Sequence, residues 1–159
     1  MGIHGEEGVA AATVMNTFYG TDTYAIDDKG RLGIPAHVRR AVGKKGKTLF
    51  LVQGFEGCLA LYTEEQWAQV EQRLAQLPQG GRKVRAFMRA LLMNATRVTV
   101  DAQGRISIPP TLRTRAGLGK EAVLLGQGVR LEIWNPDRLK SVLAEAEPHF
   151  EDLAEEVLG

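Results

Sequence analysis

The sequence contains one stretch twice: IDDKGRLGIPAHVRRAVG at residues 26–43 and VDAQGRISIPPTLRTRAG at residues 100–117. A shift of 74 residues aligns the two versions and leaves seven positions identical, among them an Asp-x-x-Gly-Arg motif. Three later pairs also agree: Leu51 with Leu125, Gln53 with Gln127, and Gly54 with Gly128. Ten identities compare with roughly two expected from ordinary residue usage, so the two halves are copies of one unit.

Each copy predicts the same order of elements: a strand, a turn, a returning strand, a short helix and a second hairpin. In the first copy these lie at 23–26, 27–30, 31–34, 36–41, and 49–52 with 59–62. In the second copy they lie at 97–100, 101–104, 105–108, 110–116, and 122–125 with 129–134. Gly43 and Gly117 follow the short helices as C-caps. A unit of two hairpins leaves sheet edges exposed, so we expect it to pair with its copy.

Amphipathic helices are predicted to flank the two units. Thr63 with Gln66 three residues later forms a capping box before an apolar stripe that begins at Trp67. A second stripe lies between residues 84 and 92, and the last helices begin at Asn135-Pro136 and are interrupted by Pro148. Trp67 and Trp134 are read as core residues. The predicted fold class is therefore α+β, mainly β.

The chain is expected to divide into five segments. They are a disordered extension or tag at 1–17, a first repeat unit at 18–77, a linking helix at 78–95, a second repeat unit at 96–143 and an acidic helical tail at 144–159. With 159 residues, 44% hydrophobic and 25% charged, the composition is that of an ordinary globular protein. No apolar run approaches the roughly 20 residues of a membrane span.

Opposite charges are segregated along the chain although the net charge is only +1. Residues 29–55 hold seven bases and no acid, and residues 72–100 hold six bases and no acid. Residues 131–159 hold eight acids against two bases. Two explanations of this charge segregation stay open. The basic segments form a surface that faces a polyanion, or the segregation results from chance combined with the packing of the fold.

The Asp-x-x-Gly-Arg motif also has two interpretations. In one, Asp27 and Asp101 cap hairpin turns and Arg31 and Arg105 fold back to pair with them. In the other, the turns present these arginines outward, with Lys29 and Gln103 beside them. The planar fork of an arginine suits guanine O6 and N7 or phosphate oxygens, and an aspartate behind it can hold its rotamer.

Four stretches resemble the MraZ family of bacterial transcriptional regulators, which carry two SpoVT/AbrB-like units. They are FYGTDTYAIDDKGRLGIPAHVR, DAQGRISIPPTLR, GFEGCLALYTEEQW and GLGKEAVLLGQGVRLEIWNPDR, and the likeness runs from about residue 18 to 143. The resemblance implies tandem swapped-hairpin β-barrel units and a ring-shaped homo-oligomer, an octamer by family likeness. It also implies binding to short direct repeats in the promoter of the division and cell-wall gene cluster, including the protein's own gene.

By the same resemblance, Lys29, Arg31 and Arg105 are expected to contact double-stranded DNA. Gln103 takes the place of Lys29 in the second copy, where it can form hydrogen bonds but adds no charge. The turn-supporting residues are Asp27, Gly30, Asp101 and Gly104. Members of the family usually begin at the position of Thr17.

The sequence offers little support for an enzymatic function. Cys58 lies in an apolar strand and is read as a buried free thiol, and the three histidines are scattered without metal-ligand spacing. We expect no enzyme activity, no cofactor and no membrane partner, and a cytoplasmic, nucleoid-associated location. The alternative function is a protein-interaction module such as an AbrB-type antitoxin, whose acidic tail engages a basic partner.

The unopposed basic segments predict that binding to duplex DNA weakens strongly with salt. Each neutralised phosphate releases counterions, so log K against log salt should fall with a slope near −0.9 per phosphate contact. Fluorescence anisotropy between about 50 and 200 mM salt measures this slope. An affinity that stays flat across the titration argues against the DNA interpretation.

Overall fold

The computed structural model of this chain describes residues 18–42 and 48–159. The strands are β1 (Phe18–Ala25), β2 (Arg31–Gly33), β3 (Thr48–Gln53), β4 (Leu59–Thr63), β5 (Thr96–Thr99), β6 (Arg105–Ser107), β7 (Glu121–Gly128) and β8 (Leu131–Trp134). The helices are α2 (Ala36–Val42), α3 (Glu64–Ala75), α4 (Arg82–Met93), α5 (Pro110–Arg115), α6 (Pro136–Ala146), the 3-10 helix η1 (Glu147–His149) and α7 (Phe150–Leu158).

The fold is mixed α and β with a large antiparallel sheet. In the part of the chain that the structure describes, the helices contain more residues than the strands, so the fold holds more helix than the expected mainly β arrangement. The difference comes from the flanking helices, because α3, α4 and α6 each run for about three turns while several strands have only three or four residues.

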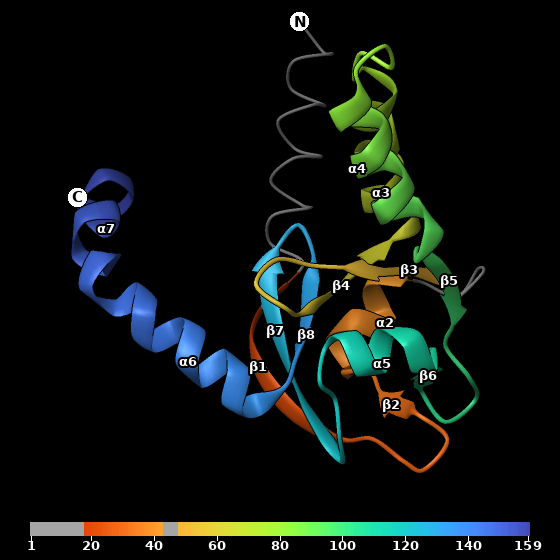
Figure 1. The fold of residues 1–159 in the computed structure, drawn as a ribbon. Coiled ribbons are helices and arrows are strands. Elements are labelled where there is room, and N and C mark those ends of the chain that lie inside the picture. The colour runs from red at the N-terminus through yellow and green to blue at the C-terminus, as the bar shows by residue number, and fades with distance from the viewer. Residues whose placement is uncertain (1–17, 43–47) are drawn as a thin grey trace, which may run out of the picture.

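Strands from both repeats are mixed in one six-stranded sheet, in the order β1-β7-β8-β4-β3-β5 (Figure 1). Three of its strand contacts join the repeats, namely β1 with β7, β8 with β4, and β3 with β5. The remaining strands, β2 and β6, pair with each other across the repeats in a small second sheet. The expectation that each unit pairs with its copy is therefore confirmed, and neither repeat forms a sheet of its own.

The first hairpin predicted within each repeat is wrong in its pairing. β1 pairs with β7 over its whole length, from Phe18 opposite Gly128 to Ala25 opposite Glu121. Toward β2 there are just the bridge between Ile26 and Leu32 and the hydrogen bond from the Asp27 N–H to the Arg31 carbonyl among the described residues. In the second repeat, β5 pairs with β3. Since β2 has only three residues, the eight-residue ladder with β7 satisfies more backbone groups than a local hairpin could. The second hairpins, β3 with β4 and β7 with β8, are confirmed.

One hydrophobic core is shared by both repeats. Leu32, Ile34 and Val38 are at most 2% exposed, and so are Ile106, Ile108 and Leu112, which stand 74 residues later. The equivalent residues of the two copies therefore pack into the same cluster. Burying such side chains contributes about 1.5 to 3 kcal/mol each, so neither copy keeps this core alone.

The capped helices begin where the sequence predicts. Thr63 Oγ1 accepts from the backbone N–H of Gln66, and the Gln66 side chain accepts from the backbone N–H of Thr63, both at 3.1 Å. Asn135 caps α6 by accepting from the Arg138 backbone N–H at 3.0 Å. Gly117 ends α5 with a φ of 64°, whereas the matching Gly43 lies outside the described residues.

Both tryptophans are core residues, as predicted. Trp67 stacks on Phe50 with ring centroids 5.5 Å apart, and Trp134 donates through Nε1 to Glu132 Oε1 at 3.0 Å. The stripe of α4 behaves differently, because none of its side chains is fully buried and Phe87 is half exposed. None of the helices that the structure describes has the length and apolar character needed to span a bilayer.

Thr63→Ala should destabilise the protein by about 1 kcal/mol, since it removes the side-chain oxygen that caps α3. Urea unfolding followed by circular dichroism measures the change. Ser141→Ala is the matched control, because this exposed hydroxyl lies within α6. Equal effects of the two substitutions would contradict the role of the cap.

Candidate nucleic-acid interface

The turn between β1 and β2 is built around the Asp27 carboxylate. Its Oδ1 accepts from the backbone N–H of Lys29 at 3.0 Å and from that of Arg31 at 2.8 Å. The backbone N–H of Gly30 donates to the Asp27 carbonyl at 2.9 Å, and Gly30 has a φ of 78°, which favours glycine. One carboxylate oxygen thus satisfies two backbone donors of the turn.

The turn between β5 and β6 repeats this geometry. Asp101 Oδ1 accepts from the backbone N–H groups of Gln103 and Arg105, both at 2.9 Å, and Gly104 has the same φ of 78°. The neighbours Asp28 and Ala102 differ between the copies, as do Lys29 and Gln103. The conformation therefore depends on the residues that the two motifs share.

The second carboxylate oxygen holds the arginine of the same turn. Asp27 Oδ2 lies 2.6 Å from Arg31 Nε, and Asp101 Oδ2 lies 3.2 Å from Arg105 Nε. Each pair uses the Nε edge of the guanidinium, and the Arg31 and Arg105 side chains stay about a third exposed, at 34% and 29%. The two interpretations of the motif are thus compatible, because an arginine that is paired through Nε still offers its terminal nitrogens.

These contacts lower the pKa of both aspartates. The main cause at Asp27 is the hydrogen bond from the Arg31 backbone N–H, which outweighs the opposing desolvation, and the Arg31 side chain lowers the pKa further. At Asp101 the hydrogen bond from the Arg105 backbone N–H is likewise the largest cause. Hydrogen bonds to the charged form favour ionisation, so both carboxylates are charged at neutral pH.

Pairing of β2 with β6 places the two turns next to each other. Gly33 is opposite Arg105 and Arg31 is opposite Ser107 in the ladder. Backbone hydrogen bonds from Ile34 to the Gly104 carbonyl, 2.8 Å, and from Ile108 to the Gly30 carbonyl, 2.9 Å, extend the pairing to the turns themselves. In Figure 1, β2 lies below α5 and β6 lies at the right of α5. Two motifs far apart in sequence thereby form one surface.

Direct contact between the turns confirms their proximity. Arg105 Nη1 lies 3.6 Å from Asp27 Oδ2, so Asp27 interacts with an arginine of each repeat. The structure thus brings together Asp27, Arg31, Asp101 and Arg105. Lys29 and Gln103 contribute their backbone N–H groups to the turns, and both residues are exposed.

Two further arginines complete this surface, and the sequence analysis did not assign them to it. A Cβ at Gly30 would lie 2.7 Å from Arg113 Nε, and the guanidinium of Arg39 occupies the corresponding place at Gly104. Each arginine thus comes from one repeat and lies against the turn of the other. The available signal was the repeat itself, since Arg39 and Arg113 are aligned and identical.

We call the six residues Asp27, Arg31, Arg39, Asp101, Arg105 and Arg113 the arginine cluster. Four arginines and two ionised aspartates leave a formal excess of two positive charges. Arg113 Nε is buried, and among the described residues it has no hydrogen-bond partner. The cluster thus suits an anionic partner, with planar donors held by carboxylates and rigid turns.

Other candidate chemistry is not supported by the geometry. Cys58 is buried, as predicted, and desolvation raises the pKa of its thiol to about 12, so the thiol is protonated at neutral pH. Within residues 18–42 and 48–159, no three His, Cys, Asp or Glu side chains gather in a group that could hold a metal ion.

Comparison with known proteins gives consistent matches. The family model described as "MraZ protein, putative antitoxin-like" matches twice, at residues 17–90 and 91–159. A protein of Ligilactobacillus salivarius is 41% identical over 141 residues, which cover 89% of this chain and 96% of the relative. A protein of Limosilactobacillus reuteri is 43% identical over 138 residues, covering 87% and 95%. A protein of Desulforamulus reducens is 40% identical over 141 residues, covering 89% and 97%. All three relatives are named "Transcriptional regulator MraZ".

The lowered pKa of the two aspartates predicts a pH-dependent contribution to stability. A carboxyl whose folded-state pKa is below its usual 3.8 stabilises the fold above pH 3.8, and this contribution is lost as pH falls through the folded-state pKa. The double variant Asp27→Asn, Asp101→Asn should therefore melt a few degrees lower than the native chain at pH 7, and the difference should close below about pH 4.

Asp28→Asn is the matched control for this melting experiment. Asp28 is an exposed neighbour in the same turn. A difference in melting temperature that persists unchanged at low pH, or an equal loss in Asp28→Asn, would show that the two carboxylates do not support the turns through their charge.

Proposed function

The chain belongs to the MraZ family, and on that premise we propose that it is a sequence-specific, double-stranded-DNA-binding transcriptional regulator that reads DNA with its arginine cluster. The observation that carries the proposal is the side-by-side placement of two identical Asp-x-x-Gly-Arg turns, one from each repeat. The names of the relatives support the regulatory role. Target and site are inferred from the cluster and from the family resemblance.

Arg31 and Arg105 are the proposed base-reading or phosphate-binding residues. Since Asp27 and Asp101 hold the Nε edges, little side-chain entropy is lost when the terminal nitrogens bind DNA. A bidentate arginine contact to guanine O6 and N7 discriminates against the wrong base by about 1 to 3 kcal/mol. The rigid turns thus favour specificity as well as affinity.

Lys29, Gln103, Arg39 and Arg113 have supporting roles in this proposal. Lys29 adds a charge next to Arg31, while Gln103 offers only hydrogen bonds next to Arg105, so the first turn should contribute more to binding. Arg39 and Arg113 lie against the opposite turns and raise the positive charge of the surface. Phosphate contacts of this kind fix the register of a protein on the duplex.

The finer fold assignment is also part of the proposal. We infer that β2 and β6 exchange between the repeats as in a swapped-hairpin barrel, which their antiparallel pairing supports. The segments 18–77 and 96–143 are then the two SpoVT/AbrB-like units, with 78–95 as the linking helix. Residues 1–17 precede the first unit, and residues 144–159 form the acidic tail.

The target and the assembly follow from the family resemblance. We propose that the protein binds short direct repeats in the promoter of the division and cell-wall gene cluster, including its own gene, in the cytoplasm and associated with the nucleoid. A ring-shaped homo-oligomer, an octamer by family likeness, would place several arginine clusters on several repeats. Such multivalency raises affinity without new contacts.

An antitoxin-like interaction module is the second candidate. The family description contains the words "antitoxin-like", and the C-terminal helices expose apolar side chains among acids. A disordered binding tail, which such modules usually carry, is absent at residues 136–158, because α6, η1 and α7 are helical there. The regulator therefore remains the preferred function.

Arg31→Ala should lose roughly 1 to 3 kcal/mol of binding per engaged site while the protein stays folded. Arg105→Ala should lose as much or less, because Gln103 brings no charge to the second turn. The measurement is a gel shift with the native upstream promoter fragment against a scrambled fragment. Lys140→Ala removes an exposed charge from α6 and is the matched control.

Melting temperatures of these variants and of Asp27→Ala separate DNA binding from folding. If the arginines only close ion pairs with the aspartates, Arg31→Ala and Asp27→Ala will destabilise together and neither will affect DNA binding selectively. Full promoter affinity of Arg31→Ala would refute the assignment of the site.

A further inference from the structure

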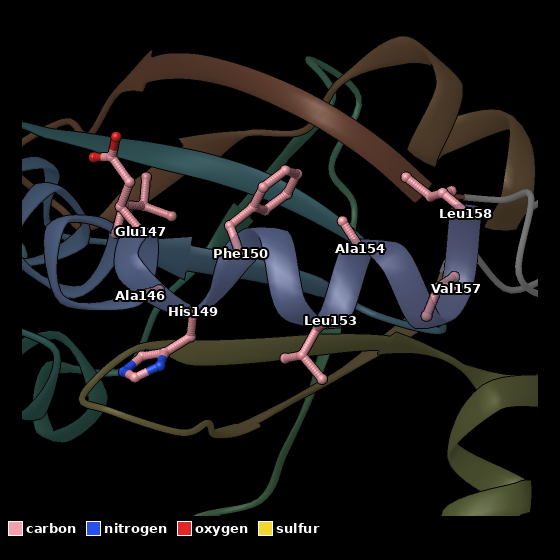
Figure 2. Close-up of a pocket in the computed structure, with 9 residues that line it drawn as sticks. Ala146, Glu147, His149, Phe150, Leu153, Ala154, Val157 and Leu158 are labelled. Atoms are coloured by element: carbon pink, nitrogen blue, oxygen red, sulfur yellow. The ribbon is translucent and has the colours of Figure 1, made fainter.

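The C-terminal segment of residues 136–158, which we call the arm, presents an uncovered apolar stripe. On α7, Phe150 is 66% exposed, Leu153 61%, Val157 78% and Leu158 79%. Figure 2 shows Phe150, Ala154 and Leu158 pointing to one side of the helix and Leu153 pointing to the other side in this view. Leaving so many large apolar side chains in water on one short helix is unfavourable, and such patches mark interaction sites.

The length of α7 supports the same conclusion. α7 has nine residues and continues from α6 through η1, and packing of its apolar side chains against another surface would stabilise so short a helix. In Figure 1 the arm extends away from β8 toward one side of the molecule. Residues 18–42 and 48–159 thus leave the apolar stripe of the arm uncovered.

A complementary groove lies between α3, α4 and the strands β3 and β4. Its volume is about 580 Å³, and its apolar lining includes Phe55, Tyr62, Trp67, Val70, Phe87 and Leu91. Phe55 is 66% exposed and Phe87 50% exposed, so part of this lining faces solvent. An apolar groove of this kind accepts the apolar face of an amphipathic helix.

The charges around the two surfaces are opposite. On α7, Glu151, Asp152, Glu155 and Glu156 surround the apolar stripe without any Lys or Arg. On the other side, the charged residues that line the groove are Arg73 and Arg130, and α4 carries Arg82, Lys83, Arg85 and Arg89 without any acid. The other helix of the groove, α3, carries Glu64, Glu65 and Glu71, none of which lines the groove. Charge complementarity favours pairing of these two surfaces and disfavours pairing of two arms.

We propose that α7 of one subunit lies in the groove between α3, α4 and the β3–β4 hairpin of a second copy of this chain. Figure 1 shows the arm at the left of the molecule and α3 and α4 at the upper right, so each subunit offers both halves of the contact at separate places. Such a contact is heterologous, and repeating it produces a closed ring or an open filament.

This inference rests on the self-association proposed above and does not depend on DNA binding. A ring that is built through other surfaces would leave the proposed function intact while this contact fails. Conversely, loss of promoter binding in Arg31→Ala has no bearing on the contact, because Arg31 lies in neither surface.

The test uses one variant of each surface in the full-length chain. Leu153→Asp with Val157→Asp places two charges on the apolar stripe of α7, and Phe87→Asp places one in the groove. Each variant should run as a single 17.4 kDa subunit in light scattering at a concentration at which the native chain is an assembly larger than a dimer. Self-association should be at least about tenfold weaker for each.

Mixing the two variants distinguishes a heterologous contact from other arrangements. The groove variant, Phe87→Asp, keeps an intact arm, and the arm variant, Leu153→Asp with Val157→Asp, keeps an intact groove. One contact between the two can therefore form, and an equimolar mixture should give dimers of twice 17.4 kDa and nothing larger. Matched controls are Met93→Asp, at an exposed position of α4 outside the groove lining, and Ser141→Asp, at an exposed position of α6 outside the apolar stripe. Both controls should assemble like the native chain.

Circular dichroism checks that each variant is folded. If Phe87→Asp loses helix, Arg73→Glu replaces it, because that change repels the acidic arm without altering the apolar lining. Three results would overturn the proposal: native assembly of the arm variant, a monomeric mixture, or a native chain that is monomeric at every concentration because its own arm covers its groove.

Discussion

The antiparallel pairing of β2 with β6 is the interaction on which the other features of this protein depend. It places Leu32 opposite Ile106 at the centre of the shared core and joins each turn to the strand of the other repeat through Ile34 and Ile108. Without it, the two Asp-x-x-Gly-Arg turns would be separate loops, and Arg39 and Arg113 would not reach the opposite glycines. Core formation and assembly of the arginine cluster are thus one event.

Within each turn, a single carboxylate both shapes the backbone and holds the arginine side chain. One oxygen of Asp27 or Asp101 binds two backbone N–H groups, and the other binds the arginine Nε. The same residue therefore sets the loop conformation and the direction of the guanidinium. Because these groups are partly exposed, their value lies in positioning the arginines more than in stability, since exposed ion pairs contribute little free energy.

The turn glycines leave room for contacts with the other repeat, whereas the helices outside the core leave apolar side chains exposed. Gly30 and Gly104 need a positive φ and also leave room for an arginine of the other repeat, so any side chain there would disturb both turns. In contrast, α4 and α7 keep apolar side chains at the surface. A subunit that buries its central core and exposes these faces is built for contact with other molecules.

Local patterns in the sequence determined the repeat, the second hairpins, the capped starts of α3 and α6, the buried tryptophans and the motif residues, because these depend on neighbours a few positions away. The same patterns misjudged the balance of helix and strand and the partners of β1 and β5. Strand partners were decided by the tertiary structure, because the backbone N–H and C=O groups along a strand edge are the same in every strand and do not specify a partner. The tertiary structure also decided that Arg39 and Arg113 join the cluster. The crossing of the two repeats brings Arg39 to Gly104, 65 residues later, and Arg113 to Gly30, 83 residues earlier.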